Sequence, residues 1–122
     1  MEKKAIASEF IKLEGAAKDA FWKAYDEYES KRKDLAQKRL ALLDKYTSKY
    51  ATLNDESTDG LVNEMIALQG QTDKLIVTYY KKIKKESGVK PAAQFYQLEG
   101  YVLSKIRVEI MENIPVIGEL DK

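Results

Sequence analysis

The 122-residue chain has no cysteine and no histidine. Without cysteine it forms no disulfide, so cysteine usage says nothing about the cellular compartment. Without histidine it lacks the commonest general base and the commonest transition-metal ligand. The sequence also shows no nucleophile beside a base. We therefore expect a protein that is not an enzyme, with no catalytic residue and no cofactor.

An excess of charge of either sign is also missing, because 21 Lys and Arg balance 20 Asp and Glu. Phosphate backbones are bound through a basic excess, so nucleic acid is not expected as the main partner. No apolar run approaches the ~20 residues needed to cross a bilayer. Glu9 interrupts the N-terminal stretch where a signal peptide would need its apolar core. The chain as given is expected to be soluble, either cytosolic or exported with its leader removed.

Proline and glycine are missing from the stretch 21–53, around which the chain is organised. Its seam residues recur in alternating steps of four and three, a spacing typical of a helix packed lengthwise against nearly antiparallel partners. A helix over about residues 16–50 would be ~50 Å long. The seam consists of Phe21, Tyr25, Tyr28, Arg32, Leu35, Arg39, Leu42, Tyr46, Lys49 and Leu53.

Helix-ending and helix-starting residues divide the rest of the chain. Gly15 ends a short first helix, Asn54 is a good N-cap, Gly88 suits a left-handed position, and Pro91 suits the first turn of a new helix. Short connections make neighbouring long helices antiparallel. We predict a single all-α domain, an elongated antiparallel helical bundle with one short N-terminal helix, two long helices and one medium helix. The predicted helices cover about residues 2–13, 16–51, 55–87 and 91–113, followed by an apolar tail, 115–122, that folds back onto the bundle.

Each remaining helix also has an apolar face. Trp22, one position off the seam, is expected to cover the first helix, and Gly70 marks either a close helix crossing or a merely tolerated glycine. The predicted faces are Ile6, Phe10 and Leu13 in the first helix; Leu61, Met65, Leu68, Thr72, Leu75 and Tyr79 in the third; and Phe95, Leu98, Val102, Ile106, Ile110 and Ile114 in the last.

Two arginines, Arg32 and Arg39, interrupt the apolar seam one heptad apart. A buried guanidinium needs a carboxylate, and Glu99 and Glu109 border the apolar stripe of the last helix. The alternative is that the aliphatic stems pack while the charged ends reach water. We expect the second arrangement for Arg32, and leave both open for Arg39, with Glu99 as its partner in the first. The role of Arg32, Arg39 and Glu99 is expected to be structural.

The eight tyrosines suit either core packing or partner binding, because the ring is apolar and the hydroxyl polar. Those on the seams are expected in the core with their hydroxyls at its edge. The others, Tyr80, Tyr96 and Tyr101, are candidates for a surface that meets partners.

Two charged segments have both a helix-end and a ligand interpretation. Asn54-Asp55-Glu56 and Asp59 suit the start of a helix, and a hard-cation site is the alternative. The basic run 81–85 suits a helix C-terminus, and an anion or membrane-surface contact is the alternative. Helix-end roles are favoured in both cases.

Two segments resemble a known family. Residues 21–32, with Phe21, Trp22, Tyr25, Tyr28 and Arg32, resemble an "FWxxYxxYxxxR" pattern of small exported bacterial helical proteins. The segment 95–100 is similar to their "FxQLEN", with Gly in place of the last Asn, and is followed by Asn-Ile-Pro-Val at 113–116. The resemblance, from about residue 13 to 117, is to the LTxxQ-motif, Spy/CpxP-like proteins. The LTxxQ motif itself is degenerate, since only the Leu remains at 13–17 and again at 53–57.

The resemblance implies a periplasmic, ATP-independent client-binding or envelope-stress accessory protein, with unfolded proteins as partners. The alternative is a helical oligomerisation or interaction module without chaperone activity, in which exposed seam residues pair two copies as a homodimer. A metal- or small-ligand-binding protein is a third, weaker hypothesis.

Overall fold

The computed structural model of the protein describes residues 3–114, which form helices and no strand. The helices are α1 (Lys3–Phe10), α2 (Gly15–Ser48), α3 (Asp55–Ser87) and α4 (Val89–Asn113), with a 3-10 turn at Tyr50–Thr52. The all-α prediction is confirmed. The expected return of the tail 115–122 onto the bundle lies outside the described residues.

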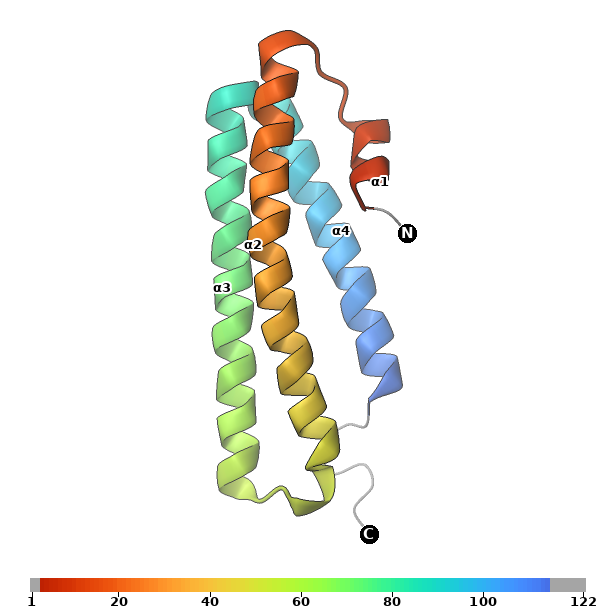
Figure 1. The fold of residues 1–122 in the computed structure, drawn as a ribbon, viewed down its shortest axis with the longest axis vertical. Helices are drawn as coiled ribbons and strands as arrows, with labels where there is room; N and C mark the ends of the chain where they lie inside the picture. Colours follow the sequence, from red (N-terminus) through yellow and green to blue (C-terminus); the bar gives the residue numbers. More distant parts are fainter. Residues whose placement is uncertain (1–2, 115–122) are drawn as a thin grey trace.

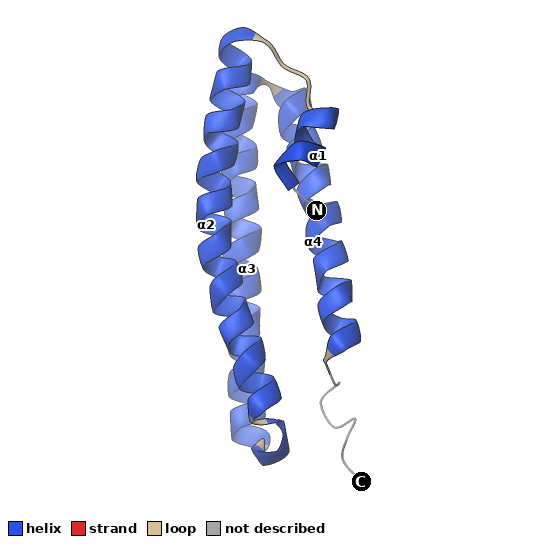
Figure 2. Ribbon diagram, turned by 45° about the vertical axis from the view of Figure 1, so that its right-hand side comes forward, coloured by secondary structure: helices blue, strands red, loops and turns tan. Residues whose placement is uncertain are grey.

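The helices form an elongated bundle, in which α2 and α3 run antiparallel side by side (Figure 1). α4 returns along them, and the short α1 packs against α4. Towards its C-terminal end α4 diverges from α2 and α3, as two views of the molecule show (Figures 1 and 2). All four helices therefore meet at one end of the bundle, whereas at the other end α2 and α3 stay side by side and α4 lies apart from them.

α2 is the unbroken rod that its heptad spacing predicts. Phe21, Tyr25 and Tyr28 are buried near its start, and Leu42 and Tyr46 near its end. Between them the seam residues Arg32, Leu35 and Arg39 are only partly buried. The seam thus runs the whole length of the helix, but the packing along it is uneven.

The ends of α3 follow from two residues. The Asn54 side chain accepts a hydrogen bond from the Ser57 amide, and the Ser57 hydroxyl accepts one from the Asn54 amide, each at 2.9 Å. This reciprocal cap satisfies amides that have no partner within the helix. At the other end Gly88, with φ +109°, is the one residue between α3 and α4. α4 therefore begins at Val89 rather than at residue 91, and Pro91 lies in its first turn.

α1 is shorter than predicted, ending at Phe10 rather than at residue 13. Its buried face also differs: Ala7 and Ile11 are buried, whereas Phe10 is 61% exposed. The Gln94 amide donates to the Phe10 carbonyl at 3.2 Å, which supplies a partner at the end of the helix.

Trp22 covers α1 as predicted. It packs against the cluster that contains the buried α1 residues, and the Lys4 ammonium lies 5.4 Å from the centre of its ring. That distance is within the range of a cation–π contact.

Two separate clusters of buried side chains form the core. The larger one joins all four helices and is rich in aromatic rings: Phe21, Tyr25, Tyr28, Tyr79 and Phe95. The smaller one, at the opposite end, has only Leu42, Tyr46 and Leu61 buried among the described residues. Gly70 does not mark a helix crossing, because a Cβ atom there would meet nothing within 4 Å.

Candidate functional site

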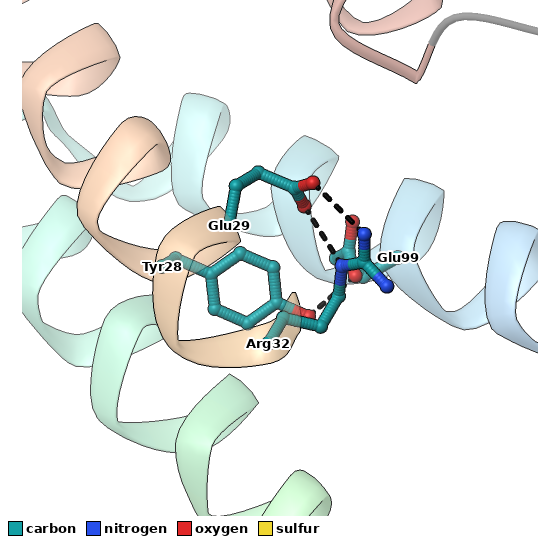
Figure 3. Close-up of polar contacts among 4 residues, drawn as sticks. All are labelled: Tyr28, Glu29, Arg32 and Glu99. Carbon is teal, nitrogen blue, oxygen red and sulfur yellow. Dashed lines mark hydrogen bonds and ion pairs between the residues drawn. The ribbon is translucent and has the colours of Figure 1, made fainter. Parts of the chain in front are cut away.

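Glu99 of α4 is a carboxylate buried in the larger core cluster, with 1% of its surface exposed. The Tyr28 hydroxyl of α2 donates a hydrogen bond to its Oε2 atom, and Tyr28 itself is fully buried (Figure 3). A buried carboxylate needs such donors, because its desolvation is otherwise uncompensated. Burial, followed by the charge of Glu99 and the hydrogen bond to it, raises the pKa of Tyr28 far above its usual range.

Arg32 completes this cluster, and the prediction that its charged end reaches water is wrong. Its Nε and Nη2 atoms donate to the two carboxylate oxygens of Glu29, at 3.2 and 3.1 Å, and its side chain is 18% exposed. Burial lowers the pKa of Arg32, but the hydrogen bonds and charge of Glu29, together with the charge of Glu99, outweigh it and raise the pKa. A partner one turn away on the same helix makes the partly buried position tolerable.

The predicted pair of Arg39 with Glu99 is not formed. Arg39 lies about three turns, or ~16 Å, beyond Tyr28 along α2, and Tyr28 is the residue that bonds Glu99. Arg39 instead donates from Nη1 to Gln69 Oε1 at 3.4 Å. Glu109, the other candidate acid, is exposed. Residue spacing placed the carboxylate on the correct face of α4 but at the wrong height along α2.

Tyr25 lies beside the cluster without joining it. Its hydroxyl is buried and has no hydrogen-bond partner among the described residues. Burial, then the negative charges of Glu29 and Glu99, raise the pKa of Tyr25 well above its ordinary value. The hydroxyls of Tyr25 and Tyr28 are therefore both inside the core, not at its edge as predicted. The buried polar cluster (Tyr28, Glu29, Arg32 and Glu99) fixes the height of α4 against α2.

Where α4 diverges, the three long helices enclose an open groove of about 200 Å³, which we call the arginine groove. Its lining is mainly aliphatic and comes from all three helices. Arg32 lies at the end nearest the buried polar cluster. The other lining residues are Leu35, Ala36, Arg39 and Leu40 of α2, Leu68 and Thr72 of α3, and Leu103, Ile106, Arg107 and Ile110 of α4.

A second hollow of about 240 Å³ continues the apolar surface between α2 and α3. Arg39 and Leu68 line both hollows, so the two meet at these residues. Large apolar side chains border them in the open: Leu40 is 61% and Ile66 63% exposed. Exposed aliphatic side chains gathered around a hollow are typical of a surface that binds a partner.

Arg39 and Arg107 give this surface its charge. Burial, and then the charge of Arg107, lower the pKa of Arg39. From the sequence alone, Arg39 is predicted to have a structural role and Arg107 is assigned none. The sequence does contain a signal for the groove. Arg39 and Arg107 each lie beside the apolar stripe of their helix, and no acidic residue in the described part of the chain is placed to pair with them.

The three predicted surface tyrosines do not form one patch. Tyr80 and Tyr96 are together, with ring centres 6.0 Å apart. Tyr80 is partly buried against the core, whereas Tyr96 is 53% exposed. Tyr101 is 62% exposed and lies on another face of α4, because five residues turn a helix by about 140° from the starting position.

The charged segments take structural positions. Asp55 and Glu56 occupy the first turn of α3, and the Asp59 carboxylate accepts from Asn63 at 3.3 Å. Lys82, from the basic run, pairs with Glu27 of α2 at 3.0 Å. Within residues 3–114, no three His, Cys, Asp or Glu side chains gather closely enough to hold a metal ion.

The fold and the groove together define a class: an all-helical protein with an open, arginine-flanked apolar groove. No helix in the described part of the chain is both long and apolar enough to cross a membrane. Comparison of the chain with protein families, with curated proteins and with solved structures found no match.

Proposed function

We propose that the protein is a non-enzymatic client-binding or envelope-stress accessory protein of Spy/CpxP-like type that holds partner proteins on its helical surface. The observation that carries the proposal is the arginine groove with its exposed rim residues, Leu40 and Ile66. Extended or helical apolar segments bind such grooves through aliphatic contacts. No bound nucleotide or catalytic group is needed for this activity.

The proposed location is the periplasm, on the strength of the family-like segments 21–32 and 95–100. Fractionation of the cells that produce the protein tests this location. Recovery with periplasmic markers is expected, and recovery with cytosolic markers would contradict it.

An aggregation assay tests client binding directly. An equimolar amount of the protein is expected to slow light scattering by a chemically unfolded client after dilution. The variants Leu40→Ser and Ile66→Ser are expected to lose much of this effect, because they remove apolar area from the rim. Val108→Ser is the matched control, since Val108 is 54% exposed on α4 but lines neither hollow.

Two outcomes would count against client binding. The first is an unaltered aggregation rate with the wild-type protein. The second is an equal loss of effect in all three variants, which would show that the groove has no special part in the activity.

A second candidate function is self-association as a helical module, and one specific feature favours it. Tyr101, Val108 and Met111 are each more than half exposed and recur at spacings of seven and three along α4. Such a stripe is suited to pairing with another helix. Light scattering coupled to size-exclusion chromatography would show a concentration-dependent dimer that Val108→Ser weakens; a strict monomer at high concentration would remove this candidate.

A further inference from the structure

Arg39 is an incompletely paired cation at the junction of the two hollows. Within residues 3–114 its guanidinium makes one hydrogen bond, at 3.4 Å, to the neutral side chain of Gln69. The Gln69 amide in turn donates to Asp73 at 2.9 Å. The carboxylate of Asp73 therefore bonds Gln69 and not Arg39. The guanidinium thus has five donors and one long hydrogen bond to a neutral acceptor.

Arg107 brings a second positive charge to the same groove from the opposite helix. Among residues 3–114, neither Arg39 nor Arg107 forms an ion pair. At the other end of the groove the charge of Arg32 is compensated, because its guanidinium donates two hydrogen bonds to the carboxylate of Glu29. The groove therefore has one neutralised end and one end with two like charges.

Like charges held beside apolar surface favour an anion between them. A carboxylate fits best, because guanidinium groups bind it through paired, directional hydrogen bonds. The surface around the two arginines is aliphatic, formed by Leu35, Leu68 and Ile110 among others. A suitable occupant thus carries a carboxylate close to aliphatic groups.

The shape of the surface favours a protein segment over a single lipid chain. Each hollow, at about 200 and 240 Å³, is smaller than a typical small-molecule pocket. The apolar lining also includes two largely exposed side chains, Leu40 in the first hollow and Ile66 in the second. Two small hollows on either side of Arg39 suit two aliphatic side chains of a peptide, with an acidic residue between them.

We infer that the arginine groove selects acidic–aliphatic segments of partner proteins, with Arg39 and Arg107 as the anchor for a Glu or Asp side chain. This inference rests on the proposed function and adds the class of segment that is held. It gives the binding surface a preference that apolar contacts alone would not supply, because aliphatic surface does not distinguish Glu from Gln.

Fluorescence anisotropy with the full-length protein and two matched peptides tests the inference. Both labelled peptides are amphipathic, with leucines at helical spacing. One carries glutamates between the leucines and the other carries glutamines at the same positions. The Glu peptide is expected to bind about tenfold more tightly, as for a charge-assisted hydrogen bond, and added salt is expected to reduce the difference.

Charge-matched variants identify the anchor. Arg39→Gln and Arg107→Gln are each expected to remove most of the preference for the Glu peptide. Lys33→Gln and Lys105→Gln remove the same charge from exposed positions of α2 and α4 that line neither hollow, and they are expected to preserve it. Arg39→Lys is expected to keep part of the preference, since charge remains while the paired geometry is lost. Circular dichroism confirms that each variant is folded; if Arg39→Gln is not, Arg107→Gln decides.

Several results would overturn the inference, and they separate it from the proposed function. Equal binding of the two peptides, with client aggregation still slowed, would reject the anchor and leave client binding intact. If Lys33→Gln or Lys105→Gln also loses the preference for the Glu peptide, the preference comes from the overall charge of the protein and not from the two arginines. If neither peptide binds and aggregation is unaffected, both proposals fail.

Other occupants have their own signatures in the same experiment. Tight binding of dodecanoate that Arg39→Gln abolishes, without binding of either peptide, would assign the groove to a lipid. A dimer that dissociates in Arg39→Gln would assign it to a second copy of the chain. Either result would overturn the inference.

Discussion

The two ends of the bundle use the same helices in different ways. At the end near Gly88 all four helices meet around aromatic side chains, with Phe95 in edge contact with Tyr25 and Tyr28. At the end near Asn54 the smaller cluster has few buried side chains, and hollows open between the helices. The first end has the packing of a core, and the second has the open apolar surface that we propose as a binding site.

The two ends of the bundle therefore differ in how much their packing contributes to stability. A tightly packed core tolerates little change in volume. A half-packed region has fewer contacts to lose and opens at lower cost in free energy. The buried polar cluster lies at the larger core cluster and joins α2 to α4 through the hydrogen bond from Tyr28 to Glu99.

The largest expected effect compares two aliphatic residues of α3, one from each end. Ile83→Ala should cost about 4–5 kcal/mol of unfolding free energy and Leu61→Ala about 2–3 kcal/mol, because the cost of a cavity depends on how well the site can collapse. Ile83 is fully buried and Leu61 is 5% exposed. Urea denaturation measures both values. Equal losses would show that the two ends are packed equally well.

A double-mutant cycle examines the buried polar cluster. Tyr28→Phe should cost about 1.5–3 kcal/mol, as expected when a hydrogen bond to a charged group is lost. Combined with Glu99→Gln, the two changes should be non-additive by at least ~1 kcal/mol, since the side chains are in contact. Tyr25→Phe is the control and should be neutral or slightly stabilising, because the buried Tyr25 hydroxyl has no hydrogen-bond partner among the described residues.

The same cycle with Arg39→Gln and Glu99→Gln should be additive, because about three helical turns separate the two sites. Coupling between Arg39 and Glu99, with none between Tyr28 and Glu99, would contradict the arrangement of the cluster.

Replacing glycines in α3 should reduce the difference in local stability between the two ends of the bundle. Gly60→Ala and Gly70→Ala should each stabilise the protein by about 1 kcal/mol, because alanine has the higher helix propensity and the new Cβ meets nothing within 4 Å. Hydrogen exchange should show slower amide exchange in the first half of α3. Gly100→Ala is the counterpart in α4, and its effect should not reach those amides.

The smallest expected effect is on the ion pair of Glu27 with Lys82. The hydrogen bond between Lys82 and Glu27 lowers the pKa of Glu27 and raises the pKa of Lys82, each relative to its ordinary value. The stabilising contribution is therefore fully present at pH values between the ordinary pKa of a glutamate and that of a lysine. It is lost as pH falls through the folded-state pKa of Glu27, and again as pH rises through that of Lys82. Thermal unfolding of Glu27→Gln should depend less on acidic pH than that of the wild type; an identical dependence would contradict this.

Much of the fold could be predicted from spacing and helix ends. The seam of α2, the cap at Asn54 and the turn at Gly88 are local features, and local chemistry determines them. The end of α1 could not be predicted in the same way, because a tertiary contact decides it: Ile11 is drawn into the core and the chain leaves the helix there.

The candidate site was harder to predict, since it depends on how α4 is placed along α2. Heptad spacing gives the face of a helix but not its height against a neighbour. The sequence therefore leaves a pair of Arg39 with Glu99 open and does not identify Tyr28 as the residue that bonds Glu99. The arginine groove depends in addition on the divergence of α4. No single sequence motif expresses that divergence, because it depends on how three helices pack along their whole length.

The single residue between α3 and α4 has a consequence for the whole chain. Gly88 reverses the backbone with a positive φ of +109°, which other L-residues rarely adopt. If that one residue took helical dihedrals, the two flanking helices would continue as one long helix, kinked where Pro91 lacks its amide hydrogen, and the last helix would leave its own bundle. One pair of torsion angles therefore decides whether the carboxylate of Glu99 meets the phenol of Tyr28 within the same chain.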